Sequence, residues 1–335
     1  MALVYSSISY VDDYNITRIS TDLVLRHFTP YPRQGEFPNP LGIRCPEQFQ
    51  IPKTITNYSF TEITDQRAFD LEDACNNDDL PIVVYWSGGI ESTLILAALH
   101  KHNIMRDRII VNLTNSSYYE NPVFFEDIIK PNYKYTNKLI NNFSDCHLIA
   151  GDTGDGLFIK VDIQELDLWK PGSYKKSIHN PDELLAFFAF KTDKEHAKWF
   201  YEAVMHNAHS ANMPLNTYED FLWWFCFNIT WCGYAFKPLE YALNQNTNDY
   251  EMFFKNNFGW YGSDDYQSWA INNTSTGLKY AGTPRSYKMP AKEYIYDVDK
   301  NWYYRDYKTK MGISSYYPKG KILQIHDDGK ILYKD

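Results

Sequence analysis

Residues 87–93, with the sequence SGGIEST, carry groups that could hold an anion: three hydroxyl side chains and two adjacent glycines. Residues 82–85 before them form an apolar, β-branched run typical of a buried parallel strand, and the spacing over 90–100 predicts a helix. Free backbone N–H groups and the helix dipole attract an anion at such a helix start, and glycines let the backbone approach a phosphate closely. The stretch therefore predicts a phosphate-binding turn.

This turn differs from the two commonest phosphate-binding motifs. No Gly-Lys-Ser/Thr follows it, as a Walker A loop requires, and the third glycine of a dinucleotide fingerprint is missing. A strand, a turn and a helix capped by a serine, with no ligand, is the alternative interpretation.

A second polar loop follows another expected strand. Residues 146–150 form an apolar run that leads directly into GDTGDGLF at 151–158, which contains Asp152 and Asp155. Loops at the carboxyl ends of strands bind the ligands of open α/β sheets. Residues 108–113 predict a further buried strand, and its distance from the first fits a right-handed strand-helix-strand unit. The alternative for the two aspartates is a purely structural role in turns.

Four segments, in order along the chain, resemble motifs of the asparagine synthetases and their relatives, which belong to the ATP pyrophosphatases and include β-lactam synthetases and lasso-peptide cyclases. WSGGIEST is similar to their S-G-G-x-D-S pyrophosphate loop, and SSYYENPVFFEDI to the loop after their second strand. AGDTGDGLF resembles their S-G-E-G-S-D-E-L-F loop, and KTKMGI their R-P-K-M-G-F segment. The resemblance covers roughly residues 65–315.

The resemblance implies a ligase that forms an amide. ATP activates a carboxylate as an acyl-adenylate, an amine captures the acyl group, and Mg²⁺ and backbone N–H groups hold the departing pyrophosphate. The implied cofactors are ATP and Mg²⁺, and the implied partners are a small-molecule or peptide carboxylate and an amine donor. Residue 2 is Ala2, so the N-terminal cysteine of the family's glutaminase domain has no counterpart. Nitrogen would then come from ammonia, a substrate amine or a separate glutaminase.

The resemblance also assigns roles to residues. Glu91 and Asp155 fall at metal-ligand positions, Asp152 at that of a general base, and Lys310 at that of the lysine that stabilises charge near the α-phosphate. The residues implied to contact the nucleotide are Trp86, Ser87, Gly88, Gly89, Glu91, Ser92, Thr93, Val111, Asn112, Leu113, Gly151 and Lys308. Glu91 replaces the family's Asp and Gly156 replaces its Glu, which leaves open a nucleotide-binding protein without catalysis.

The net charge and the cysteines of the chain disfavour several classes of function. The 335-residue chain has a formal net charge of −9, which argues against nucleic acid as a partner and disfavours, without excluding, a tRNA-modifying ATP pyrophosphatase with the same first loop. The five cysteines form no C-x-x-C pair, which disfavours a zinc-dependent nitrile-forming relative and favours a reduced, cytoplasmic compartment. The sequence shows no signal peptide and no apolar run long enough to span a membrane.

The elements around these motifs predict an α/β fold. We expect a parallel sheet flanked by helices, which the resemblance places in the ATP pyrophosphatase class (adenine nucleotide alpha hydrolase-like), with a helical C-terminal part. The expected domains are an N-terminal extension and partly irregular arm over 1–64, the ATP pyrophosphatase domain over 65–315 and a β-hairpin over 316–335. The expected helices span 65–76, 182–241 in large part, 250–258 and 291–304, with another from Pro122 and a buried core helix at 221–231.

Overall fold

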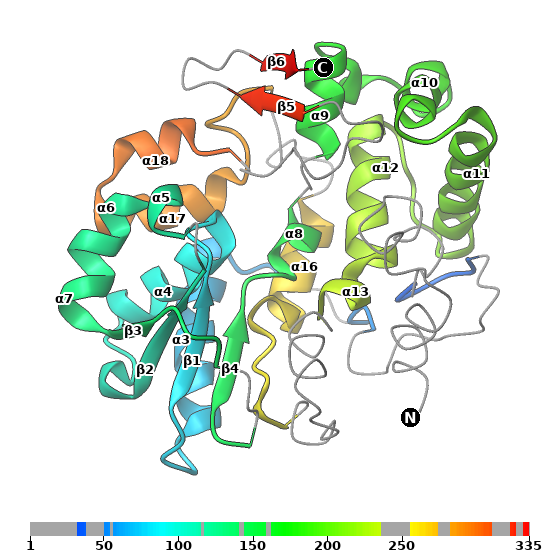
Figure 1. Ribbon diagram of the computed structural model, residues 1–335. Helices are drawn as coiled ribbons and strands as arrows, with labels where there is room; N and C mark the ends of the chain where they lie inside the picture. Colours follow the sequence, from blue (N-terminus) through cyan, green and yellow to red (C-terminus); the bar gives the residue numbers. More distant parts are fainter. Residues whose placement is uncertain are drawn as a thin grey trace, which may run out of the picture. The chain divides into compact units, whose positions relative to one another are not determined.

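The computed structural model divides the chain into two compact units (Figure 1). The sheet unit comprises Ile51–Ile159 and Gly233–Thr309, and the helical unit comprises Met1–Gln50, Lys160–Cys232 and Lys310–Asp335. The structure describes residues 32–37, 50–53, 56–114, 117–140, 144–158, 162–235, 255–273, 282–309, 322–325 and 331–334.

A four-stranded parallel sheet forms the centre of the sheet unit, so the predicted α/β class is confirmed. Its strands are β1 (Ile82–Trp86), β2 (Ile109–Leu113), β3 (Lys134–Thr136) and β4 (His147–Ala150), in the order β3-β2-β1-β4. The sequence predicts β1, β2 and β4 from their apolar runs. It gives no signal for β3, because this edge strand is short, polar and largely exposed.

The strand order changes direction at β1. From β1 the chain moves to β2 and β3 on one side, and then returns to place β4 on the other side of β1. Such a reversal leaves a crevice at the carboxyl ends of the two strands that flank it. The polar loops after β1 and β4 therefore meet at the same edge of the sheet.

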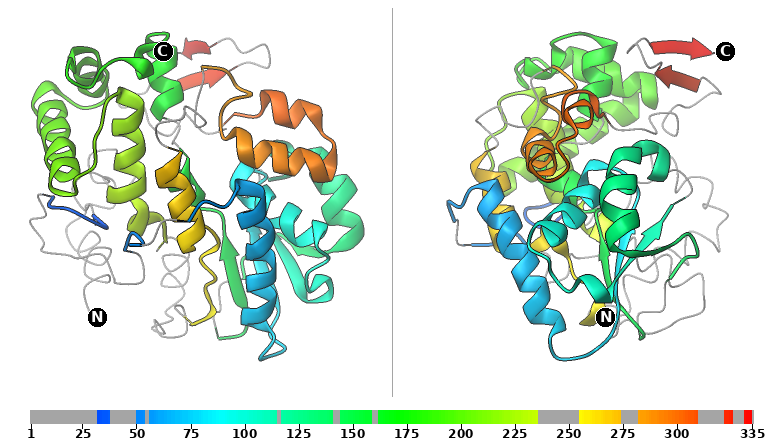
Figure 2. Two further views of the ribbon diagram at one scale, coloured as in Figure 1. Left: turned by 180° about the vertical axis from the view of Figure 1, so that it is seen from behind. Right: turned by 90° about the vertical axis from the view of Figure 1, so that its left-hand side faces the viewer.

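Helix α4 (Ile90–Lys101) connects β1 to β2 and starts directly at the glycine turn. It packs against α17 (Met289–Asp299) and α3 (Phe60–Cys75). The view from behind shows α3, in blue, running lengthwise in front of the strands (Figure 2). Helix α3 starts five residues before the expected position, because Ser59 and Glu62 form a capping box that fixes its first turn.

The expected helix 291–304 is wrong as one element. It is two helices, α17 and α18 (Trp302–Tyr307), because Lys300 adopts a left-handed conformation (φ 55°) that ends α17. Asn301 then caps α18 by accepting a hydrogen bond from the Tyr304 N–H. The two helices pack against each other.

The connection from β2 to β3 contains α5 (Ser117–Glu120), α6 (Pro122–Phe124), a π-helical turn (Phe125–Ile129) and α7 (Lys130–Asn132). The expected helix start at Pro122 is confirmed, with Asn121 as its cap. Trp86 at the end of β1 stacks on Phe124 and Phe125 and also binds α4 through Thr93. This apolar contact joins the two connecting segments next to the glycine turn.

The loop after β4 leads into α8 (Gly154–Leu157), which packs near α16 (Asp264–Asn272). Residues 255–259 run beside β4, and Leu148 forms a parallel bridge with Asn257. The expected helix 250–258 therefore does not reach Phe258, whose N–H donates to the Leu148 carbonyl. Residues 250–254 lie outside the described part of the chain.

The helical unit contains α9 (Asp162–Trp169), α10 (Asp182–Lys191), α11 (Lys194–Ser210), α12 (Tyr218–Trp224), a π-helical turn (Phe225–Ile229) and α13 (Trp231–Ala235), whose last residues belong to the sheet unit. The expected core segment 221–231 is buried throughout, and Trp224 donates a hydrogen bond to Asn207. Strands β5 (Ile322–Ile325) and β6 (Ile331–Lys334) pair antiparallel, as the hairpin prediction required. Among the helices that the structure describes, none has the length and apolar character to cross a membrane.

Candidate nucleotide-binding site

The hydroxyl groups of Ser87 and Ser92 stabilise the Ser87–Gly89 turn. The Ser92 Oγ accepts a hydrogen bond from the Ser87 N–H at 3.1 Å, and the Ser87 Oγ accepts one from the Gly89 N–H at 3.2 Å. Gly89 is the N-cap of α4 and offers no side chain to the N–H groups of the first helical turn. The backbone N–H groups at the start of α4 therefore have no side-chain cap, as at helix starts that bind anions in other proteins.

Gly88 has a left-handed backbone conformation (φ 76°), and α5 comes very close to it. A Cβ at Gly88 would lie 2.4 Å from the Ser117 carbonyl oxygen and 2.7 Å from the Glu120 Cβ. The Tyr304 hydroxyl donates to the Gly88 carbonyl at 3.0 Å. This glycine therefore admits a neighbouring helix as well as a tight turn, a second reason for its presence that the motif alone does not reveal.

The loop after β4 packs directly on the first turn of α4. A Cβ at Gly154 would lie 2.6 Å from the Glu91 Cγ, and a Cβ at Gly151 would lie 2.8 Å from the Ser92 nitrogen. The buried Tyr261 hydroxyl donates to the Glu91 carbonyl at 2.7 Å. The two polar loops that the sequence singles out are thereby brought together in the sheet unit.

The two expected metal ligands share one cation, and that cation is a lysine. The Lys288 ammonium contacts both Glu91 Oε1 and Asp155 Oδ1. Lys288 is 1% exposed, and the side chains of Glu91 and Asp155 are 16% and 8% exposed. Low exposure strengthens such an ion pair and makes an unpaired member costly.

These carboxylates also fit the donor preference of Mg²⁺. The ion takes oxygen ligands, commonly one or two carboxylates completed by phosphate oxygens and water. Two carboxylates that reach the same nitrogen atom can reach the same metal ion, once the lysine has turned away. Among the described residues, no group of three or more His, Cys, Asp or Glu side chains is placed to hold a metal.

A second lysine-carboxylate pair lies next to the glycine turn. The Lys308 ammonium donates to Glu120 Oε2 at 2.7 Å, and the two side chains are 6% and 15% exposed. Glu120 belongs to α5, the helix that covers Gly88. Two buried ammonium groups therefore lie near the glycine turn, that of Lys288 at Glu91 and that of Lys308 at Glu120.

Several side chains that we expect to contact the nucleotide form hydrogen bonds within the protein instead. The Trp86 indole N–H donates to the Thr93 hydroxyl at 3.0 Å, and both side chains are fully buried. The Asn112 amide donates to the Thr136 and Lys138 carbonyls and accepts from the Ile140 N–H. These side chains stabilise the end of the sheet, so only their backbone is left for a nucleotide.

The other residues that we expect in the site lie in β2, in the turn after β4 or outside the described part of the chain. Leu113 ends β2 and pairs with Trp86 at the end of β1, whereas Val111 lies in the middle of β2, opposite Val84. Asp152 lies half-buried in the turn after β4, one residue beyond Gly151. Lys310 lies outside the described residues.

Sequence reasoning missed Lys288, Glu120, Tyr261 and Tyr304. Lys288, Tyr261 and Tyr304 join the site from distant parts of the chain and belong to no motif, whereas Glu120 lies in the SSYYENPVFFEDI segment, whose similarity to the family's loop assigns it no role. No pattern in the sequence marks Lys288, because the stretch before α17 resembles an ordinary turn.

Comparison with protein-family models, curated proteins and solved structures finds no match to the chain.

Proposed function

We propose that the chain is an ATP-dependent ligase of the adenylating type. It would activate a substrate carboxylate as an acyl-adenylate, release pyrophosphate and transfer the acyl group to an amine. The observation that carries the proposal is the contact of Glu91 and Asp155 with one ammonium group, beside the uncapped start of α4. A helix start supplies N–H donors for phosphate, and a cation held by two carboxylates supplies the charge that a triphosphate needs.

The reaction would proceed in two displacements. A carboxylate oxygen attacks the α-phosphorus of ATP, and the bond to the β,γ-pyrophosphate breaks. The amine nitrogen then attacks the acyl carbon, AMP leaves, and Asp152 accepts the proton from the nitrogen. The role of Asp152 rests on the resemblance to asparagine synthetases, as does the role of Lys310 in stabilising charge at the α-phosphate.

The pyrophosphate would be held by the Ser87–Gly89 turn and the first turn of α4, between Lys288 and Lys308. Glu91 and Asp155 would hold Mg²⁺, which when bound neutralises part of the negative charge of the leaving group. Lys288 would then be released from the two carboxylates and turn to the phosphates. Lysine suits this movement, because its ammonium is a point charge on a flexible stem.

A non-catalytic nucleotide-binding protein is the second candidate, and one observation favours it. The Lys288 ammonium already occupies the position between Glu91 and Asp155, so a nucleotide could bind against this lysine without a metal ion. The two candidates differ in the role of Mg²⁺ and in turnover.

The test is pyrophosphate release from ATP and Mg²⁺ in the presence of a panel of carboxylic acids and amines, with ATP binding measured separately by calorimetry. We expect release that depends on a carboxylic acid, and its loss in Asp155→Asn. The exposed Asp73 on α3 provides the matched control, Asp73→Asn, which should retain release. ATP binding without release across the panel would support the second candidate, and no ATP binding would exclude both.

A further inference from the structure

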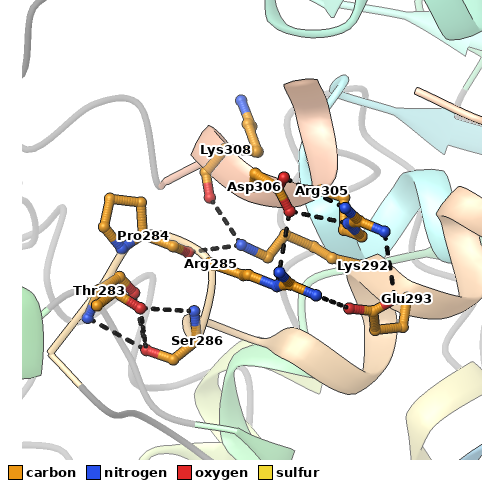
Figure 3. Close-up of polar contacts among 9 residues, drawn as sticks. All are labelled: Thr283, Pro284, Arg285, Ser286, Lys292, Glu293, Arg305, Asp306 and Lys308. Carbon is orange, nitrogen blue, oxygen red and sulfur yellow. Dashed lines mark hydrogen bonds and ion pairs between the residues drawn. The ribbon is translucent and has the colours of Figure 1, made fainter. Parts of the chain in front are cut away.

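Lys292 on α17 is fully buried, although a lysine is rarely buried without a partner. Its amine donates to the Pro284 carbonyl at 2.6 Å and lies 3.3 Å from the Lys308 carbonyl, to which it also donates (Figure 3). Both acceptors are backbone atoms, and they belong to segments on either side of α17. The side chain therefore ties together two segments that are distant in the chain.

A ring of alternating charges lies beside this contact. Arg285 pairs with Glu293 at 3.4 Å and with Asp306 at 3.6 Å, and Arg305 pairs with the same carboxylates at 4.0 Å and 2.8 Å. Figure 3 shows these four side chains beside the Lys292 side chain, whose amine points past them to the two carbonyls. They come from the turn before α17, from α17 and from α18, so the ring joins the same segments as Lys292.

The charges that face Lys292 act in opposite directions. Burial is the largest influence and lowers the pKa of the Lys292 amine to about 7, with Arg285 adding to the decrease, while Asp306 and Glu293 act to raise it. A neutral amine has two N–H groups, and the two carbonyls accept both. Both N–H groups of the neutral form are thus hydrogen-bonded without a counter-ion.

The two tethered segments carry the lysines of the candidate site. Pro284 begins the turn that ends at Lys288, and the second carbonyl is that of Lys308 itself. The Lys308 side chain points away from Lys292 (Figure 3) and reaches Glu120, whereas Lys288 reaches Glu91 and Asp155. Lys292 therefore fixes the backbone behind both site lysines and contacts neither of their ammonium groups.

We infer that Lys292 is a positioning residue that sets the separation of Lys288 and Lys308 for the polyphosphate of a bound nucleotide. This inference rests on the proposed function, since it assigns the two ammonium groups to the phosphates of ATP.

The test compares ATP and pyrophosphate binding by calorimetry in the wild-type chain and in three variants. Lys292→Met keeps the length of the side chain and removes both donors, and Lys292→Arg keeps donors together with a permanent charge. Lys300→Met is the matched control, because Lys300 follows the same helix and its side chain is 68% exposed. Hydrogen exchange of the segments 283–288 and 305–309 is followed in parallel.

We expect Lys292→Met to weaken binding of both ligands by about tenfold, the equivalent of losing one hydrogen bond to a site segment. Exchange should rise in both segments. Lys292→Arg should recover most of the affinity at about pH 6, where the wild-type amine is also charged, and Lys300→Met should behave as wild type. If wild type binds ATP and Lys292→Met binds it within about twofold, this inference is wrong and the proposed function stands. If wild type binds neither ligand, the proposed function fails and the inference fails with it.

If Lys292→Met does not fold, the inference is tested by comparing the pH dependence of ATP binding in wild type and in Lys292→Arg. The wild-type amine changes its charge near neutral pH, whereas the guanidinium stays charged. We expect the ratio of the two dissociation constants to change between about pH 6 and pH 8. Because both proteins bind the same ligand, titration of the phosphates affects both dissociation constants equally and cancels in their ratio. A ratio that stays constant with pH would overturn the inference.

Discussion

The carboxylate of Asp155 and the ammonium of Lys288 form a buried ion pair across 133 residues of sequence. Asp155 follows β4, and Lys288 precedes α17, the helix that packs on α4. The pair therefore connects the loop after β4 to the start of α17, which packs against the helix that follows the neighbouring strand β1. It also places a positive charge beside the only backbone N–H groups of α4 that lack helical partners, those of its first turn.

Removal of the Lys288 ammonium should destabilise the fold in a way that Mg²⁺ corrects. In Lys288→Met, the half-buried Glu91 and the buried Asp155 lie together without a cation, and a broken buried pair costs about 3–5 kcal/mol of unfolding free energy. Because both carboxylates reach one position, Mg²⁺ should restore part of this loss. Urea unfolding with and without Mg²⁺ measures both effects.

The control for this experiment is Lys300→Met, whose exposed side chain should contribute little with or without the metal. Equal responses of Lys288→Met and wild type to Mg²⁺ would show that the two carboxylates do not form a common cation site.

The Lys308–Glu120 pair should behave as a coupled unit. Lys308→Met alone leaves a half-buried carboxylate and Glu120→Gln alone leaves a buried ammonium, so each single change should destabilise the chain. The double variant removes both charges and should be more stable than the sum of the single effects predicts. The expected coupling is about 0.5–3 kcal/mol, measured by a double-mutant cycle in urea, and strict additivity would contradict the pairing.

Gly88→Ala should be more destabilising than its backbone angle alone explains. Gly172 has almost the same φ (78° against 76°), but no atom lies within 4 Å of a Cβ added there, whereas the Ser117 carbonyl would lie 2.4 Å from one at Gly88. Both alanine variants share the cost of a left-handed residue, and only Gly88→Ala adds a clash. We expect a further loss of about 1–3 kcal/mol at Gly88. Equal losses, measured by chemical denaturation, would mean that α5 moves away freely.

The parts of the site that sequence could predict are those with a local cause. The run of Ile82, Val83 and Val84 specifies a buried strand by residue type, and the following glycines specify a turn. The loop at Asp152 and Asp155 stands out because polar residues follow an apolar strand directly. In each case, neighbours in sequence determine the feature.

The parts that sequence could not predict depend on distant packing. Strand β3 is polar and lies at an edge, so its pairing with β2 leaves no alternating pattern. Lys288 and Lys292 look like surface lysines until α17 is placed against α4 and the Pro284 turn against α18. Burial and partner, which give a lysine its role here, are properties of the tertiary structure.

Lys292 should give the stability of the chain a characteristic pH dependence. The pKa of its amine is about 7 in the folded chain and 10.5 in the unfolded chain, so between these values the unfolded state binds more protons. Stability then rises with pH in this window, by up to about 1.4 kcal/mol per pH unit, because the cost of burying the charged amine is fully present below pH 7 and disappears above 10.5.

Lys292→Met should lack this rise, and Lys300→Met should keep it. The difference in unfolding free energy between wild type and Lys292→Met, measured in urea across the window, isolates the contribution from that of other titrating groups. A difference that stays constant with pH would show that the buried amine keeps its ordinary pKa.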